Sequence, residues 1–110
     1  MLYTNINKGI IFISIENFIS EKTIKELNEE VDFMLYDQGM DYYAFNFNNL
    51  NYFSRSFLEN FKNLLTEIFL KCGRVAIYGL DKITKNIFGT RKYDMYYVDK
   101  EEDIFKLLSL

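Results

Sequence analysis

Apolar and polar residues alternate along this chain with two periods, and the periods predict its secondary structure. Residues 2–6 alternate weakly, Lys8-Gly9 is a turn pair, and the run at 10–15 (IIFISI) is rich in β-branched residues. This pattern predicts a β-hairpin. Residues 21–37 follow with apolar side chains at helical spacing, which predicts a first helix.

The middle of the chain repeats a strand, a helix and a strand. Residues 42–47 and 75–78 are short apolar runs typical of buried parallel strands. Residues 56–71 between them predict a second helix with a wide apolar stripe. The stripe consists of Phe57, Leu58, Phe61, Leu64, Leu65, Ile68 and Phe69. Gly73 is expected to end this helix in a left-handed conformation.

The last third of the sequence predicts a short helix at 82–88, a strand at 95–98 and a closing helix after Asp99. The predicted order is therefore β-β-α-β-α-β-α-β-α. This order indicates one α/β domain over residues 1–110, with a mixed sheet of about five strands covered by helices.

Composition narrows the possible chemistry. A chain of 110 residues with 49% apolar content can bury one core without metal or disulfide support. The net charge of −3 disfavours nucleic-acid binding, and the lack of histidine removes imidazole catalysis and the commonest metal ligand. Cys72 is the only cysteine, so no cysteine cluster exists for zinc. We expect no metal, no cofactor and no enzymatic activity.

The same features bear on location. A lone cysteine fits a reducing compartment, and Cys72, at the end of an apolar helix, is expected to be buried or half-buried. Asn5, Asn7 and Lys8 interrupt the N-terminal segment, which therefore lacks the layout of a signal peptide. No apolar run approaches the length of a membrane span. A cytoplasmic protein without membrane insertion is expected.

Two serines, Ser54 and Ser56, stand at the entrance of the second predicted helix. Backbone N–H groups are unpaired there and the helix dipole is positive, so each serine could cap the helix, and a phosphate or an acidic partner would be stabilised. Arg55 between them is either solvated or available for a bidentate contact with an acidic group. Tyr52 and Phe53 are expected to be exposed and to form an apolar patch for a partner together with Phe57, although core packing is the alternative for Phe53.

From Ala44 onward the sequence resembles the STAS domain, the family of anti-sigma-factor antagonists and of related domains on anion transporters. The family pattern is a strand ending in Leu-Asp-Leu, a loop, and then Phe-Ile-Asp-Ser-Ser-Gly-Leu at a helix start. Residues 45–47 (FNF) fall on the first part and residues 52–58 (YFSRSFL) on the second. The resemblance extends over nearly the whole chain and lies in the order and spacing of elements more than in identical residues.

The resemblance implies a non-enzymatic protein-interaction module of bacterial signalling, whose partner is an anti-sigma factor or a kinase-like signalling protein. In the family, the serine before the glycine is phosphorylated by the cognate kinase, and Ser56 holds that position, with Ser54 the other candidate. Residues 52–57 are the implied partner-binding surface. The chain departs from the pattern at Asn46 and Ser54 (aspartates in the family), Arg55 (serine) and Phe57 (glycine).

A second interpretation is a small ligand-binding or catalytic α/β domain with a pocket at the carboxyl ends of its strands. The residues that would line such a pocket are Asn46, Asn48, Asn49, Ser54 and Ser56. Neither a glycine-rich phosphate loop nor a carboxylate pair at fixed spacing supports it. The oligomeric state is left open by the sequence.

Overall fold

The computed structural model describes residues 2–16, 19–49, 54–80 and 95–108. The elements in chain order are β1 (Leu2–Asn7), β2 (Ile10–Ile15), α1 (Glu21–Asp32), a π-helical segment η1 (Phe33–Asp37), β3 (Tyr42–Asn46), α2 (Arg55–Leu70), β4 (Arg74–Tyr78), β5 (Met95–Val98) and α4 (Glu101–Leu108). The predicted order of strands and helices is confirmed. The helix predicted at 82–88 lies outside the described residues.

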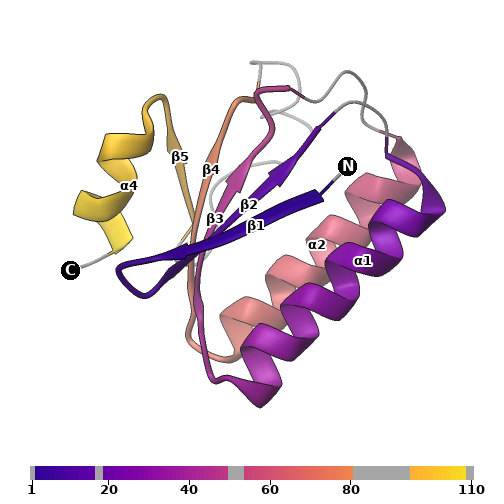
Figure 1. The fold of residues 1–110 in the computed structure, drawn as a ribbon, viewed down its shortest axis with the longest axis horizontal. Coiled ribbons are helices and arrows are strands. Elements are labelled where there is room, and N and C mark those ends of the chain that lie inside the picture. Colours follow the sequence, from indigo (N-terminus) through magenta and orange to yellow (C-terminus); the bar gives the residue numbers. More distant parts are fainter. Residues whose placement is uncertain (1, 17–18, 50–53, 81–94, 109–110) are drawn as a thin grey trace.

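The strands form a single sheet in the order β1-β2-β3-β4-β5. The hairpin strand β1 is antiparallel to β2, whereas β2 to β5 are mutually parallel. Helices α1 and α2 lie side by side on one face, and α4 covers the other face (Figure 1). Because β2, β3 and β4 run in the same direction, their carboxyl ends meet at one edge of the sheet.

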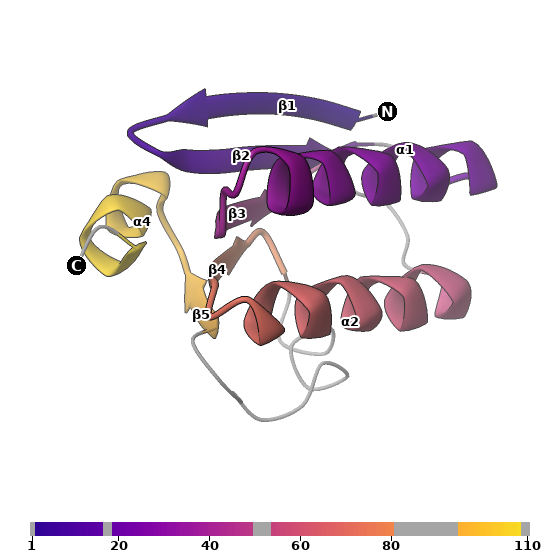
Figure 2. The ribbon, with the colours of Figure 1, turned by 90° about the horizontal axis from the view of Figure 1, so that it is seen from below.

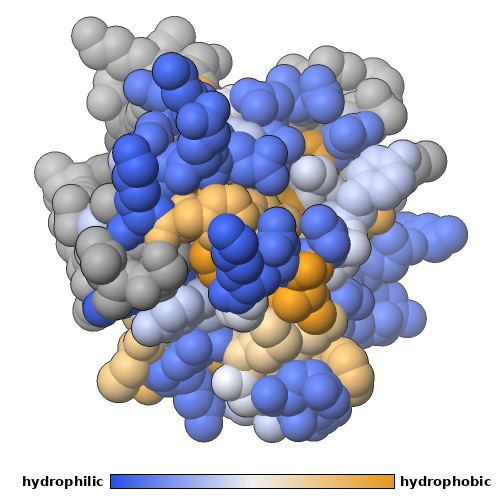
Figure 3. Space-filling view, turned by 60° about the vertical axis from the view of Figure 1, so that its left-hand side comes forward, coloured by the Kyte–Doolittle hydropathy of each residue, from blue (hydrophilic) through white to orange (hydrophobic). Residues whose placement is uncertain are grey.

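Side chains of β3 divide between two hydrophobic cores, as strand geometry requires. Tyr43 and Phe45 point to the α1/α2 face and join the larger core, whereas Ala44 points to the α4 face. The smaller core contains Phe12 from β2 and Ile104 from α4. On the side that carries the β1–β2 turn and α4, a band of apolar side chains runs between hydrophilic ones (Figure 3).

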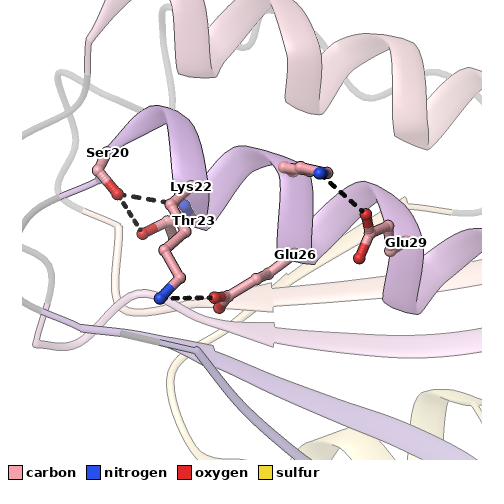
Figure 4. A network of polar contacts seen from close by, with 6 residues as sticks. Ser20, Lys22, Thr23, Glu26 and Glu29 are labelled. Carbon is pink, nitrogen blue, oxygen red and sulfur yellow. Dashed lines mark hydrogen bonds and ion pairs between the residues drawn. The ribbon is translucent and has the colours of Figure 1, made fainter.

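Helix α1 begins at a capping serine. The Ser20 hydroxyl accepts a hydrogen bond from the Thr23 N–H at 3.2 Å, which satisfies one unpaired donor of the first turn. Exposed ion pairs follow along the helix, with Lys22 4.0 Å from Glu26 (Figure 4). Such exposed pairs contribute little to stability, so the cap and the buried face define this helix.

The end of α1 widens into a π-helical segment. The Gln38 N–H donates to the Phe33 carbonyl at 3.1 Å, across five residues. Leu35 remains buried in this segment, while Phe33 and Tyr36 are exposed. The helix predicted over residues 21–37 is therefore confirmed in extent, with a different hydrogen-bond pattern in its last turn.

The end of α2 differs from the prediction. The Gly73 N–H donates to Ile68 O and the Cys72 N–H donates to Phe69 O, both at 2.9 Å, in the Schellman pattern. The left-handed residue of this motif is Cys72, with φ of 59°, and not Gly73. Glycine is needed at 73 for space, since a Cβ there would lie 2.5 Å from the Asp41 carbonyl.

Cys72 is also exposed, so the expectation of a buried or half-buried thiol was wrong. The turn that ends α2 carries the backbone away from the apolar stripe before β4 begins, and Cys72 lies on this turn.

The described residues contain neither a membrane-spanning helix nor a cluster of metal ligands. Within these ranges, no helix is both long and apolar enough to cross a membrane. The same part of the chain contains no cluster of three or more carboxylate, cysteine or histidine side chains that could hold a metal ion.

Because a left-handed conformation costs a residue with a Cβ about 1 kcal/mol or more, Cys72→Gly is expected to stabilise the protein by about 1 kcal/mol. Urea unfolding followed by circular dichroism measures the change. Cys72→Ala is the control, because it removes the thiol but keeps the Cβ. An equal gain in both variants would assign the effect to the thiol and contradict the backbone explanation.

Candidate docking site at the start of helix α2

Ser54 is the N-cap of α2. Its backbone is extended, and its hydroxyl accepts a hydrogen bond from the Phe57 N–H at 3.0 Å. Its carbonyl accepts the first helical bond, from the Leu58 N–H at 3.1 Å. Of the two serines that could cap this helix, Ser54 is the cap, and its hydroxyl is bonded to the backbone.

Phe57 points into the protein. Its ring is fully buried, meets the Phe47 ring edge to face at 6.1 Å between centroids, and stacks with Phe61 at 5.7 Å. The expectation that Phe57 contributes to an exposed apolar patch is therefore wrong. The helical stripe places this residue on the buried face of α2. Its aromatic neighbour there is Phe47, which directly follows β3. Tyr52 and Phe53, the other residues of that predicted patch, lie outside the described residues.

Ser56 and Arg55 occupy the outer side of the same turn, and both are exposed. Arg55 Nε lies 3.6 Å from Glu59 Oε1, one turn along the helix, and the two side chains are 93% and 70% exposed. An ion pair so exposed is worth well under about 1 kcal/mol and is readily exchanged for another contact. The first turn of α2 therefore presents a hydroxyl and a guanidinium to solvent.

The loop that leads to this turn is anchored at its beginning. The Asn46 side-chain oxygen accepts a hydrogen bond from the Asn48 N–H at 2.9 Å, and the Phe47 N–H donates to the Tyr78 carbonyl at 2.9 Å. Gly79 lies so close to Asn48 that a Cβ would collide with its backbone nitrogen. These contacts hold the start of the loop against the end of β4.

The polar residues proposed for a ligand pocket are engaged with one another and with the backbone. Asn46 bonds to the backbone of Asn48, Asn49 Nδ2 is 3.4 Å from Glu16 Oε1, and Ser54 caps α2. Asn48, Asn49 and Ser56 are the members of this set with exposed side chains. Because Asn46, Asn49 and Ser54 are engaged in these contacts, the arrangement does not favour the ligand-binding interpretation.

A polar hollow lies elsewhere, between α1 and α2. It is lined by Asn28, Asp32, Asn60, Asn63, Leu64 and Glu67. Asn28 and Asn60 exchange reciprocal amide hydrogen bonds of 3.1 and 3.0 Å, which connect the helices. Burial raises the pKa of Glu67, and the nearby Asp32 carboxylate raises it further. Sequence reasoning missed this cluster, because only the packing of α1 on α2 brings its members together.

The sheet order, the two helices on one face and the capped helix after β3 are those of the STAS fold. The anti-sigma factor antagonist SpoIIAA in its unphosphorylated form matches with a TM-score of 0.80 at 10% identity, over 94% of this chain and 92% of that chain. SpoIIAA of Bacillus in its phosphorylated form matches with 0.80 at 12% identity, over 97% of this chain and 99% of that chain.

A serine-to-glutamate variant of RsbS from Moorella thermoacetica matches with a TM-score of 0.81 at 11% identity, over 98% of this chain and 94% of that chain. No protein-family model matches the sequence, and no curated protein matches it in sequence. At such low identity, the likeness shows the fold and leaves the activity to be argued from the site.

The two serines are expected to differ in their effect on stability. Ser54→Ala removes the N-cap and should lower the free energy of unfolding by about 1 kcal/mol. Ser56→Ala, the matched control, should change it by less than about 0.5 kcal/mol, because its side chain is exposed. Chemical denaturation of both variants measures the difference. Equal losses would mean that the capping role has been assigned to the wrong serine.

Proposed function

We propose that this chain is a non-enzymatic protein-interaction module of the anti-sigma-factor antagonist type, which docks onto a signalling protein through the first turn of α2. The observation that carries the proposal is that the residues of this turn have different structural roles. Ser54 caps the helix and Phe57 anchors it, so Arg55 and Ser56 are presented outward on a rigid element. The fold shared with SpoIIAA supports the same assignment.

The inward direction of the Phe57 ring removes a steric objection to docking at this turn. A bulky residue in place of the family's glycine would obstruct a partner only if its ring projected from the surface. Here the ring packs against Phe47 and Phe61 in the core. The outer side of the turn is left to the smaller Ser56, which allows a partner surface to approach the helix start.

The electrostatics of the turn suit a negative group. The helix N-terminus and Arg55 both favour an anion, and the amide of Asn46 and the hydroxyl of Ser54 replace carboxylates that would repel one. Asn46 still makes the loop hydrogen bond that an aspartate oxygen could accept. We therefore propose an acidic partner surface, or a phosphate on Ser56 itself, as the group that this turn accommodates.

Docking is tested with an anti-sigma factor or kinase-like protein encoded near this gene. The double variant Arg55→Ala/Ser56→Ala is expected to bind at least about tenfold more weakly in isothermal titration calorimetry, because it removes the exposed polar contacts of the turn. Lys62→Ala/Asn63→Ala, which changes exposed residues further along α2, is the matched control and should bind as the wild type does. Unchanged affinity of the first variant would show that the docking surface lies elsewhere.

Phosphorylation is tested separately. Incubation with the cognate kinase and ATP, followed by intact-mass analysis, should show one added phosphate on the wild type and on Ser54→Ala, and none on Ser56→Ala. The exposed hydroxyl of Ser56 is available to a kinase, whereas that of Ser54 is bonded to the backbone. A wild type that gains no phosphate would contradict the phosphorylation cycle and leave docking as a distinct question.

A further inference from the structure

The strand β1 forms one edge of the sheet, and it lacks the usual protection against pairing. Among the described strands it pairs only with β2, and it is the outermost strand in Figure 2. Its sequence, LYTNIN, contains no charged residue and no proline. Tyr3 and Ile6 are about half exposed, at 51% and 49%. Natural edge strands usually carry lysine, proline or a bulge because a bare edge is a template for another strand.

The turn at Lys8 and Gly9 decides which backbone groups face outward. Both residues have positive φ, 53° and 78°, which is a two-residue type I′ turn. In such a turn the flanking residues Asn7 and Ile10 form a hydrogen-bonded pair, and hydrogen-bonded pairs alternate along an antiparallel ladder. Leu2, Thr4 and Ile6 therefore direct their N–H and C=O groups away from β2.

We propose that β1 pairs antiparallel with β1 of a second copy of this chain, around a twofold axis at Thr4. In this register Thr4 lies opposite Thr4 of the copy, and Leu2 lies opposite Ile6. All the outward backbone groups of these residues then bond across the interface. A shift by two residues in either direction loses part of these bonds, so the edge is self-complementary in this register above all others.

The side chains agree with this pairing. Leu2, Thr4 and Ile6 share the face of Ile11, Ile13 and Ile15, next to the larger core. Each Leu2–Ile6 contact therefore extends the apolar face of the sheet across the axis, and Tyr3 pairs with Asn5 on the other face. Since β1 has no charge, no like charges of the strand oppose each other, which favours a second copy as the occupant.

The pair leaves the docking sites accessible. A twofold axis perpendicular to the sheet reverses the direction of the second sheet, so the carboxyl ends of the parallel strands point away from each other. The two α2 starts would then lie at opposite ends of a continuous sheet. A dimer of this kind presents two docking surfaces and could bind a multivalent partner with increased avidity.

The test uses charges at the axis. Sedimentation equilibrium of the wild type, from micromolar to millimolar concentration, should show the mass rise from 13.2 kDa toward twice that value. Thr4→Lys alone and Thr4→Glu alone should each raise the dissociation constant about fivefold or more, because like charges meet directly across the axis. An equimolar mixture of the two should regain at least the wild-type affinity, since position 4 then faces its opposite charge.

Asn5→Lys is the control for added charge. It places the same lysine on the same strand opposite Tyr3, and its dissociation constant should stay within about threefold of the wild type. At concentrations where the wild type is monomeric, circular dichroism melts of the position 4 variants should match it, because Thr4 is exposed and its N–H does not bond to β2. A wild type that stays monomeric at every concentration, or a mixture that associates no better than the single variants, would overturn the proposal.

Discussion

The packing of aromatic rings between β3 and α2 is the interaction on which the rest of the structure depends. Phe45 and Phe61 meet edge to face at 4.8 Å, and Phe47 contacts both Phe61 and Phe57 in the same manner. All four rings are buried. Because rings of this size have few ways to interlock, they fix the rotation of α2 about its axis as well as its position. The direction of every exposed residue in the first turn follows from that rotation.

This constraint explains how the turn tolerates departures from the family pattern. A glycine at position 57 would leave the end of β3 without the edge-to-face partner that Phe47 now has. Phenylalanine fills this space from the helix side and adds no bulk outside. In the same way, Asn46, uncharged where the family pattern has aspartate, accepts the hydrogen bond that holds the start of the loop. The start of α2 is held by contacts that differ from those implied by the family pattern.

Much of the fold could be predicted from the sequence, because hydrophobic periodicity and capping or turn residues are local signals. The helical stripe of α2, the β-branched run of β2 and a serine cap at the start of α2 all follow from neighbouring residues in the chain. That stripe already placed Phe57 on the buried face, and the exposed patch was expected only from its position beside the serines. Cys72 could not be placed, since Gly73 indicated the left-handed residue, whereas glycine is needed there for space beside Asp41 and Cys72 is left-handed. The amide pair of Asn28 and Asn60 likewise exists only through helix packing.

The two surfaces of interest are governed by different parts of the backbone. At the start of α2, the helix terminus favours negative charge, so exposed side chains would decide which partner the proposed docking surface accepts. At β1, a whole row of donors and acceptors faces outward, and register decides what can pair with it. The carboxyl ends of the parallel strands hold the first surface, and the antiparallel hairpin creates the second along one side of the sheet. Because the hairpin is short and closed by a two-residue turn, its register is fixed within the chain, and a fixed register is the condition for recognising one particular strand.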